Sequence, residues 1–475
     1  MSDERSILQV AVIGHTNAGK TSLMRTLSRD AAFGAVSPSP ATTTEVASVK
    51  LLAGNEEVAD FRDTPGLEDP IGLLELIDGL RTDRRDDGPS LIERFLGGPE
   101  ATGSFAGEAK ALQQARIADI VLYVVDARDR VLPRHSDELE LLARCGRPVL
   151  PVMNFTADDS TRTEEWRDAL ARLGLHATTS FDTVVYDATD EQRLFESMAV
   201  LVDEHRSALM RLIKDRKQRR TRSIKRASRT IAELLVDAAA YVQPVPAAPG
   251  GDGAAEETAV REAENTMQQV LREHESMAHQ AIFAAFEFGD EDPGKLVLEC
   301  TDGRLGIDLF SREALRQAGL GAMAGAAGGA AGGAAIDLAV GGMSLGAAAL
   351  IGALLGGAFG STATQGKRLV RRARGANDLH AGDVVLQLLL ARSLDLTLSL
   401  MRRGHAHVDS VDIAQRTLDQ QFTKDVLTTL KRARSNPSWS GVGRSPHQGS
   451  DRQRTVERLA EHIRDRITTL TAPAK

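Results

Sequence analysis

The chain has 475 residues, 26% of them charged, and a net charge of −8, which predicts a protein of two or three domains. The acidic balance disfavours nucleic acid as the partner of the whole surface, although local basic stretches occur. Its two cysteines, Cys145 and Cys300, lie far apart and exclude a disulfide framework or a cysteine metal site. The charged N-terminus has no apolar signal core, so we expect a cytoplasmic protein.

A phosphate-binding loop is predicted close to the N-terminus. Residues 7–14 form an apolar run typical of a buried parallel strand, and Gly14 to Thr21 then match G-x-x-x-x-G-K-[ST] before a helical pattern. In such a loop the backbone amides face the phosphates, Lys20 neutralises the β- and γ-phosphates, and Thr21 binds Mg²⁺. A glycine-rich turn without a ligand is the alternative. The predicted nucleotide contacts are Gly14, His15, Thr16, Asn17, Ala18, Gly19, Lys20, Thr21 and Ser22.

A second element follows about forty residues after the loop, where a predicted strand ends in the sequence DTPG, residues 63–66. A carboxylate at a strand end can hold the metal, and the Gly66 amide can sense the γ-phosphate. A threonine from the intervening cluster Thr42, Thr43 and Thr44 is expected to complete the metal shell; the alternative is a solvated loop. The resulting candidates are Lys20, Thr21, Asp63 and Gly66 for catalysis, and Thr21, Thr43 and Asp63 for the metal.

Together, GHTNAGKTS, the ATTT loop and DTPG resemble GTPases of the TrmE–Era–EngA–septin-like group of the TRAFAC class, in bacterial members that add a C-terminal domain of unknown function. The resemblance covers about residues 5–200. It implies a doubly wound α/β P-loop domain that binds GTP or GDP with Mg²⁺ and switches or hydrolyses. In potassium-dependent relatives the asparagine matching Asn17 helps to hold K⁺, which would act as an arginine finger does. The alternative is that Asn17 tolerates a tight turn.

The base-reading motif departs from the family's Asn-Lys-x-Asp. Asn154 matches, Phe155 replaces the lysine, and Asp158 arrives one residue late. A small bulge would let Asp158 accept the guanine N–H donors; otherwise guanine selectivity weakens and ATP becomes a candidate. The third base-contacting loop has Asp182 and Thr183 where a Ser-Ala pair is usual.

The segment after Gly66 is unusual in two ways. Leu67 occupies the place of the water-orienting glutamine of Ras-like proteins, so hydrolysis needs another group. Some fifty residues then precede the predicted strand 119–128, and this length predicts an enlarged second switch that faces a protein effector. We hypothesise that one nearby carboxylate positions water; the candidates are Glu68, Asp69 and Glu75.

The rest of the chain is predicted to be mostly α-helical. Residues 206–229 carry eleven Lys or Arg and one acid, which favours a solvated helix face, with anionic lipid contact as the second interpretation. Residues 319–360 are rich in Gly and Ala at spacings of four, which predicts a helical hairpin that enters a membrane or packs as a soluble pair. The expected parts are a GTPase domain 1–205, a basic helix 206–243, a linker 244–256, a helical domain 257–435, and a linker with a final helix 436–475.

We therefore expect a GTP-binding switch or a Mg²⁺-dependent GTPase that is slow without a partner or potassium. We expect it in the cytoplasm, either peripheral to the inner face of the cytoplasmic membrane or anchored there by the hairpin. One alternative is a ribosome- or RNA-associated assembly GTPase, for which the basic helix would be the binding surface. Another is a degenerate scaffold that binds nucleotide poorly.

Overall fold

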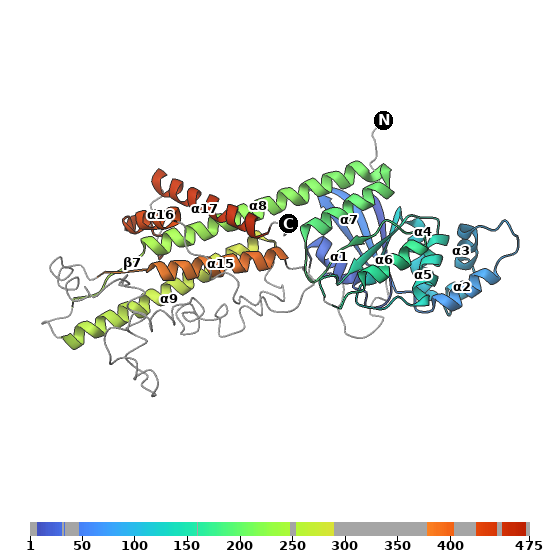
Figure 1. Cartoon of the computed structure of the whole chain (residues 1–475), viewed down its shortest axis with the longest axis horizontal. Helices are drawn as coiled ribbons and strands as arrows, with labels where there is room; N and C mark the ends of the chain where they lie inside the picture. The colour runs from blue at the N-terminus through green and yellow to red at the C-terminus, as the bar shows by residue number, and fades with distance from the viewer. Residues whose placement is uncertain are drawn as a thin grey trace. The chain divides into compact units, whose positions relative to one another are not determined.

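The computed structural model describes residues 7–30, 33, 47–158, 160–247, 253–288, 378–402, 424–443 and 449–471 (Figure 1). The described residues form two compact units. One lies within Met1–Arg220 and Met401–Val408, and the other within Thr221–Leu400 and Asp409–Lys475. The first unit is α/β and the second is mainly helical, so the predicted fold class is confirmed.

The first unit is built around a six-stranded sheet with the order β2-β3-β1-β4-β5-β6. β2 runs antiparallel to β3, and every other neighbouring pair is parallel. The central strands are continuous apolar runs because helices cover both of their faces. The strands are β1 (Leu8–Ile13), β2 (Ala47–Ala53), β3 (Glu56–Asp63), β4 (Ile120–Asp126), β5 (Val149–Asn154) and β6 (Thr179–Ser180).

Helices bury both faces of this sheet, which makes the domain doubly wound. Successive side chains of a strand point to opposite faces, so Val10 and Val12 join one apolar core while Ala11 and Ile13 join the other. The first core also contains residues of α1 and α7, and the second contains residues of α2 to α6. These helices are α1 (Lys20–Ser28), α2 (Pro70–Gly79), α3 (Gly88–Leu96), α4 (Ala106–Ile117), α5 (Pro133–Arg144), α6 (Thr163–Arg172) and α7 (Ala188–Leu201).

The register of the parallel strands brings their carboxyl ends to one edge of the sheet. Val12 near the end of β1 lies opposite Asp63, the last residue of β3. Asp126 at the end of β4 lies opposite Asn154 at the end of β5. The polar residues that follow these strands therefore gather at this edge, which is where ligands bind in open α/β sheets.

The long segment between β3 and β4 is folded. It contains α2, α3, the short 3₁₀ helix η1 (Pro99–Ala101) and α4. Figure 1 shows α2 and α3 together at one end of this unit, close to α5. The apolar residues Leu91, Ile92 and Phe95 of α3 are buried in the core under the sheet, so the predicted enlarged switch segment is a packed helical insertion.

The second unit combines a small two-stranded sheet with long helices. The strands β7 (Val242–Gln243) and β8 (Leu379–His380) pair antiparallel. Helix α8 (Arg206–Ala240) contributes residues to both units. The other described helices of the second unit are α9 (Gly253–Ala285), α15 (Asp383–Arg402), α16 (Lys424–Arg434) and α17 (Ser450–Leu470).

A buried polar contact holds the segment between α16 and α17. Asp237 of α8 accepts hydrogen bonds through Oδ1 from Arg452 Nη2 at 2.7 Å and from the Gly441 amide at 3.0 Å. The Ser440 hydroxyl donates to the Asp237 carbonyl oxygen at 3.0 Å, and the neighbouring Trp439 is buried. This stretch falls within the predicted linker, yet residues 437–443 are packed because their polar groups find partners on α8.

No helix among the described residues is long and apolar enough to span a bilayer. The predicted Gly/Ala hairpin 319–360 and the metal candidate Thr43 lie outside the described residues.

Candidate functional site

The loop between β1 and α1 needs glycine at two positions. Gly14 has a φ of 156°, and a Cβ there would lie 2.2 Å from the Val124 carbonyl oxygen of β4. Gly19, directly before α1, has a φ of 90°, and a Cβ there would lie 2.2 Å from Asn154 Nδ2. Any other residue would be strained and would clash with the neighbouring strand ends. Asn17 is exposed and has a φ of 68°, a left-handed conformation that asparagine adopts more readily than most residues.

Lys20 is buried at the start of α1. Its ammonium group donates hydrogen bonds to the carbonyl oxygens of Gly14 at 2.9 Å and His15 at 3.0 Å, so the side chain folds back along the loop. Burial lowers the pKa of Lys20, and the negative charges of Asp63, Glu138 and Glu68 oppose this shift. A cation that is desolvated in this way gains most from an anionic ligand, because a phosphate would offset the lost hydration.

Thr21 and Asp63 meet directly. The Thr21 hydroxyl donates to Asp63 Oδ2 at 2.6 Å, which links the first turn of α1 to the end of β3. Burial raises the pKa of Asp63, while the Thr21 hydrogen bond and the Lys20 charge lower it. A hydroxyl and a carboxylate provide the oxygen ligands that Mg²⁺ prefers, so the residues present fit the predicted metal.

Asn154 ties the end of β5 to the phosphate-binding loop. Its Nδ2 donates to the Ala18 carbonyl oxygen at 3.0 Å. Its Oδ1 accepts from the Phe155 amide at 2.9 Å and from the Thr183 amide and hydroxyl at 3.0 and 3.1 Å. One buried carboxamide therefore joins the phosphate-binding loop, the base loop and the loop after β6.

Phe155 lies beside the phosphate-binding loop. It has a φ of 57°, and its Cζ would be 3.3 Å from a Cβ on Gly19. The guanidinium carbon of Arg128 lies 4.1 Å from the centroid of the Phe155 ring, within the range of a cation–π contact. Arg128 itself is held by two hydrogen bonds to the carboxylate of Asp126. The residue that replaces the usual lysine is thus an aromatic surface next to Gly19.

The two aspartates of the base loops have different surroundings. Asp158 is exposed, and its Oδ1 accepts from the Ser160 amide at 2.8 Å and hydroxyl at 2.6 Å, contacts that lower its pKa. Asp182 is buried, and its carboxylate accepts from the amides of Ala157, Val184 and Val185. Asp182 therefore shapes the loop, and Asp158 is the carboxylate open to solvent.

The segment after Gly66 contacts the phosphate-binding loop. A Cβ on Gly66 would lie 3.0 Å from Thr16 Oγ1, and the Thr16 hydroxyl donates to Glu68 Oε1 at 2.7 Å. The amides of Glu68 and Asp69 both donate to Oε1 of Glu108, a buried residue of α4, at 3.2 Å. The residues that follow Gly66 are therefore hydrogen-bonded both to the phosphate-binding loop and to α4.

Two family models match this chain. The model described as 50S ribosome-binding GTPase matches residues 9–155. The model described as Domain of unknown function (DUF3482) matches residues 167–461, more than half of the chain. The chain belongs to the DUF3482 family. Its N-terminal domain is a P-loop GTPase domain of the TRAFAC class, as the motifs predicted. The DUF3482 match begins inside α6 and extends into α17, so it includes the end of the sheet domain as well as the helical unit.

Solved structures similar to this DUF3482 chain are distant. Aquifex aeolicus Era bound to GDP and AlF4⁻ is 20% identical with a TM-score of 0.29, over 41% of this chain and 56% of Era. Era in complex with MgGDPNP and 16S ribosomal RNA is 17% identical with a TM-score of 0.30, over 42% and 58%. The bacterial selenocysteine-specific elongation factor EF-Sec is 15% identical with a TM-score of 0.26, over 42% and 29%. The chain thus spans less than two thirds of each. No curated protein matches it.

The structure of this DUF3482 chain also contains a buried cluster that the motifs did not predict. The Tyr123 hydroxyl in the middle of β4 donates to Glu138 of α5 at 2.5 Å, and His15 Nδ1 lies 3.5 Å from the other oxygen of Glu138. Burial and the Glu138 charge raise the pKa of Tyr123 well above its ordinary value, so the phenol keeps its proton. A tyrosine within an apolar strand needs a buried hydrogen-bond partner for its hydroxyl, so Tyr123 in the apolar sequence of β4 could have indicated such a cluster.

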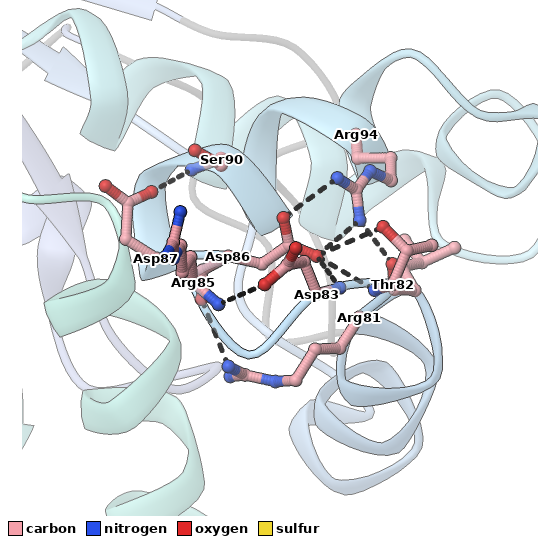
Figure 2. Close-up of polar contacts among 9 residues, drawn as sticks. Arg81, Thr82, Asp83, Arg85, Asp86, Asp87, Ser90 and Arg94 are labelled. Carbon is pink, nitrogen blue, oxygen red and sulfur yellow. Dashed lines mark hydrogen bonds and ion pairs between the residues drawn. The ribbon is translucent and has the colours of Figure 1, made fainter.

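The turn between α2 and α3 is organised by one carboxylate (Figure 2). Asp86 Oδ2 accepts from the amides of Thr82 at 2.8 Å and Asp83 at 2.9 Å, and the Arg94 guanidinium donates to both of its oxygens. Arg94 also donates to the Leu80 carbonyl oxygen. The turn between α2 and α3 is therefore closed by hydrogen bonds among its own residues and Arg94 of α3.

Proposed function

We propose that the N-terminal unit binds GTP or GDP with Mg²⁺ and hydrolyses GTP slowly. The observation that carries the proposal is the convergence of Lys20, Thr21 and Asp63 behind a loop that tolerates only glycine at two positions. In the bound state Thr21 and Asp63 would hold the metal, and Lys20 would neutralise the phosphates. The metal would supply charge neutralisation at the phosphate oxygens.

Calorimetric titration with GTP, GDP and ATP in the presence of Mg²⁺ tests this proposal. We expect binding of guanine nucleotides by the wild-type chain and its loss in Lys20→Ala. Lys110→Ala, which removes an exposed ammonium group on α4, is the matched control and should bind as the wild type does. Equal binding by Lys20→Ala and wild type would overturn the proposal. Binding of no purine nucleotide by the wild type would favour the degenerate scaffold.

Guanine selectivity through Asn154 and Asp158 is part of the same proposal. The exposed Asp158 carboxylate supports it, because both Ser160 contacts go to the same oxygen, Oδ1. A preference for ATP in the titration would overturn guanine selectivity but would still agree with the proposed phosphate and Mg²⁺ site.

Stimulation by K⁺ through Asn17 is a further part of the proposal. The resemblance to potassium-dependent relatives supports it, and the left-handed backbone of Asn17 equally supports a purely conformational role. Hydrolysis rates in K⁺ and in Na⁺ decide between them. A several-fold higher rate in K⁺ is expected, and equal rates would remove the potassium proposal.

We infer that the insertion between Gly66 and β4 is the part that responds to the nucleotide and faces a protein effector. Its direct contact with the phosphate-binding loop, through Thr16 and Glu68, supports this role. Hydrogen exchange of α2 and α3 should differ between the GDP-bound and GTP-analogue-bound chain. Identical exchange in both states would contradict the switch.

We propose that the protein associates with a membrane through residues 319–360, and that the basic helix contributes to this association. The basic side chains exposed on α8 support an anionic partner; they are Arg206, Lys214, Lys217, Arg222, Lys225, Arg226 and Arg229. Cosedimentation with vesicles containing anionic lipid, with and without GTP, should recover the protein in the pellet. Recovery wholly in the supernatant, together with steeply salt-dependent retention on ribosomes, would favour the ribosome-associated alternative.

A further inference from the structure

Water activation for GTP hydrolysis has no assigned residue in this chain. Leu67, directly after Gly66, is 1% exposed and belongs to the apolar core under the sheet. An aliphatic side chain that is buried in this way can neither orient a water molecule nor accept its proton. Another group near the phosphates must do so.

Two of the three nearby carboxylates are placed elsewhere. Asp69 caps α2, and its Oδ1 accepts from the Gly72 amide at 2.9 Å. Glu75 is an exposed residue further along α2. Asp69 and Glu75 are therefore part of α2 and its cap, and Glu68 is the candidate that remains.

Glu68 differs from both because its carboxylate is at the phosphate-binding loop. Glu68 Oε1 accepts from the Thr16 hydroxyl at 2.7 Å, and this contact joins residues that are 52 positions apart in the chain. The negative charge of Glu68 also acts on Lys20, whose pKa it helps to raise against the effect of burial. The carboxylate is therefore within electrostatic reach of the group that would bind the β- and γ-phosphates.

The backbone beneath Glu68 is fixed. The amides of Glu68 and Asp69 are both held by Oε1 of Glu108, which is 6% exposed. The Glu68 side chain is itself exposed, and the hydrogen bond from the Thr16 hydroxyl holds its carboxylate at the phosphate-binding loop. A carboxylate on a fixed backbone beside the phosphate-binding loop is positioned in advance, which is what a general base requires.

We propose that Glu68 is the catalytic residue that orients and deprotonates the attacking water, an inference that rests on the proposed GTPase function. The water oxygen forms a bond to the γ-phosphorus while the bond from that phosphorus to the β–γ bridging oxygen breaks. The electron pair of the broken bond stays on the β-phosphate of GDP. Glu68 takes one proton from the water and returns it to the released phosphate, so the enzyme is regenerated.

The test separates basicity from hydrogen bonding at Glu68. Glu68→Gln keeps an oxygen that accepts from Thr16 but removes the base, whereas Glu68→Asp keeps the base on a shorter side chain. Glu75→Gln removes an exposed carboxylate from α2 and is the matched control. Single-turnover hydrolysis of GTP and affinity for a fluorescent GDP analogue are measured for all four proteins, with circular dichroism as a check on folding.

We expect Glu68→Gln to bind the analogue within about threefold of wild type and to hydrolyse GTP about 100-fold more slowly, the range for loss of a general base. Glu68→Asp should retain an intermediate rate, and Glu75→Gln the full rate. Hydrolysis by Glu68→Gln at the wild-type rate would overturn the inference, and so would a wild-type chain that binds GTP without hydrolysing it. A wild-type chain that binds no nucleotide would instead refute the proposed function on which the inference rests.

Discussion

The Nδ2 group of Asn154 donates a hydrogen bond to the carbonyl oxygen of Ala18 at 3.0 Å, across 136 positions of the chain. The same carboxamide accepts from the Thr183 amide and hydroxyl. Asn154 is 1% exposed, so these groups have no access to water once their partner is removed. The residue therefore links three loops of the site, in addition to the role in guanine selectivity that we propose for it.

Asn154→Ala is expected to destabilise the N-terminal unit by about 1–3 kcal/mol, because it leaves several buried polar groups without a partner. Thr183→Val removes the hydroxyl contact with Asn154 and keeps the backbone amide bond, so its cost should be smaller. Thermal unfolding of the two variants and the wild type measures this order. The interpretation would fail if Thr183→Val were as destabilising as Asn154→Ala.

The contiguous phosphate-binding motif explains why much of this site could be predicted from the sequence. Gly14, Gly19 and Lys20 have roles set by local backbone geometry, and Asp63 comes close to Thr21 because parallel strands end at one edge. The contact of Thr16 with Glu68, and its support by Glu108, depends on how α4 packs against the residues that follow Gly66. No local pattern contains that information.

Phe155 and Asp158 should affect nucleotide binding in different ways. Stacking on an aromatic ring does not depend on the identity of the base, and is worth about 1–3 kcal/mol per base. Phe155→Ala should therefore weaken GTP and ATP by similar factors. Asp158→Ala should weaken GTP alone, because a carboxylate reads the guanine N–H donors.

Competition titrations with GTP and ATP on both variants measure these factors. An unchanged affinity of Phe155→Ala for both nucleotides would show that the ring beside Gly19 is not a platform for the base. A parallel loss of GTP and ATP in Asp158→Ala would mean that this carboxylate does not select guanine.

Asp86 should keep the α2–α3 turn closed. The hydrogen bond from Arg94, with those from the Asp83 and Thr82 amides, holds the pKa of this carboxyl far below its usual range. The turn should therefore stay closed at mildly acidic pH, since the stabilisation is lost only as pH falls through the depressed value. Asp86→Asn weakens these contacts, and we expect faster hydrogen exchange at Thr82 and Asp83 and faster proteolysis of residues 80–88.

The matched control for Asp86→Asn is Glu75→Gln, which removes one carboxylate charge from the neighbouring helix α2 at an exposed position. Its exchange and proteolysis should equal those of the wild type. Similar protection in Asp86→Asn and Glu75→Gln would mean that the contacts shown in Figure 2 do not order the turn.

Cys145 should be inert in the folded protein. It is buried under the sheet, and burial raises the pKa of its thiol to about 12. Because the thiolate is the reactive species, a Cys300→Ser chain should resist a thiol reagent at pH 8 in buffer and react fully in denaturant. Rapid labelling of the native Cys300→Ser protein would contradict this burial. The complementary Cys145→Ser chain reports the reactivity of Cys300 separately.

The helical unit was harder to predict than the sheet domain for a physical reason. The sequence SNPSWSGVG has the composition of a linker, yet Ser440 and Gly441 are held by Asp237 more than 200 positions earlier. The composition of this segment predicts a flexible linker because it contains no sign of its partner. The partner, Asp237, lies on α8 and is distant in the sequence. The same holds for His279, which contacts Ser393 of another helix.

His279 of α9 should make the stability of the second unit depend on pH. It is fully buried, its Nε2 lies 3.2 Å from Ser393 Oγ of α15, and Glu275 and Arg392 are its charged neighbours. Burial lowers the pKa of His279, so the folded chain keeps the ring neutral while the unfolded chain takes up a proton below about pH 6.5. The free energy of unfolding should therefore fall as pH decreases from about 7 towards the depressed pKa, with a slope that approaches about 1.4 kcal/mol per pH unit.

Denaturant titrations at several pH values measure this slope. His279→Gln removes the titrating ring, so its unfolding free energy should decline less steeply with acidification, whatever its absolute stability. His462→Gln, which replaces an exposed histidine of α17, is the control and should keep the wild-type slope. If His279→Gln retains the full slope, the pH dependence arises from other groups and the buried ring is not its source.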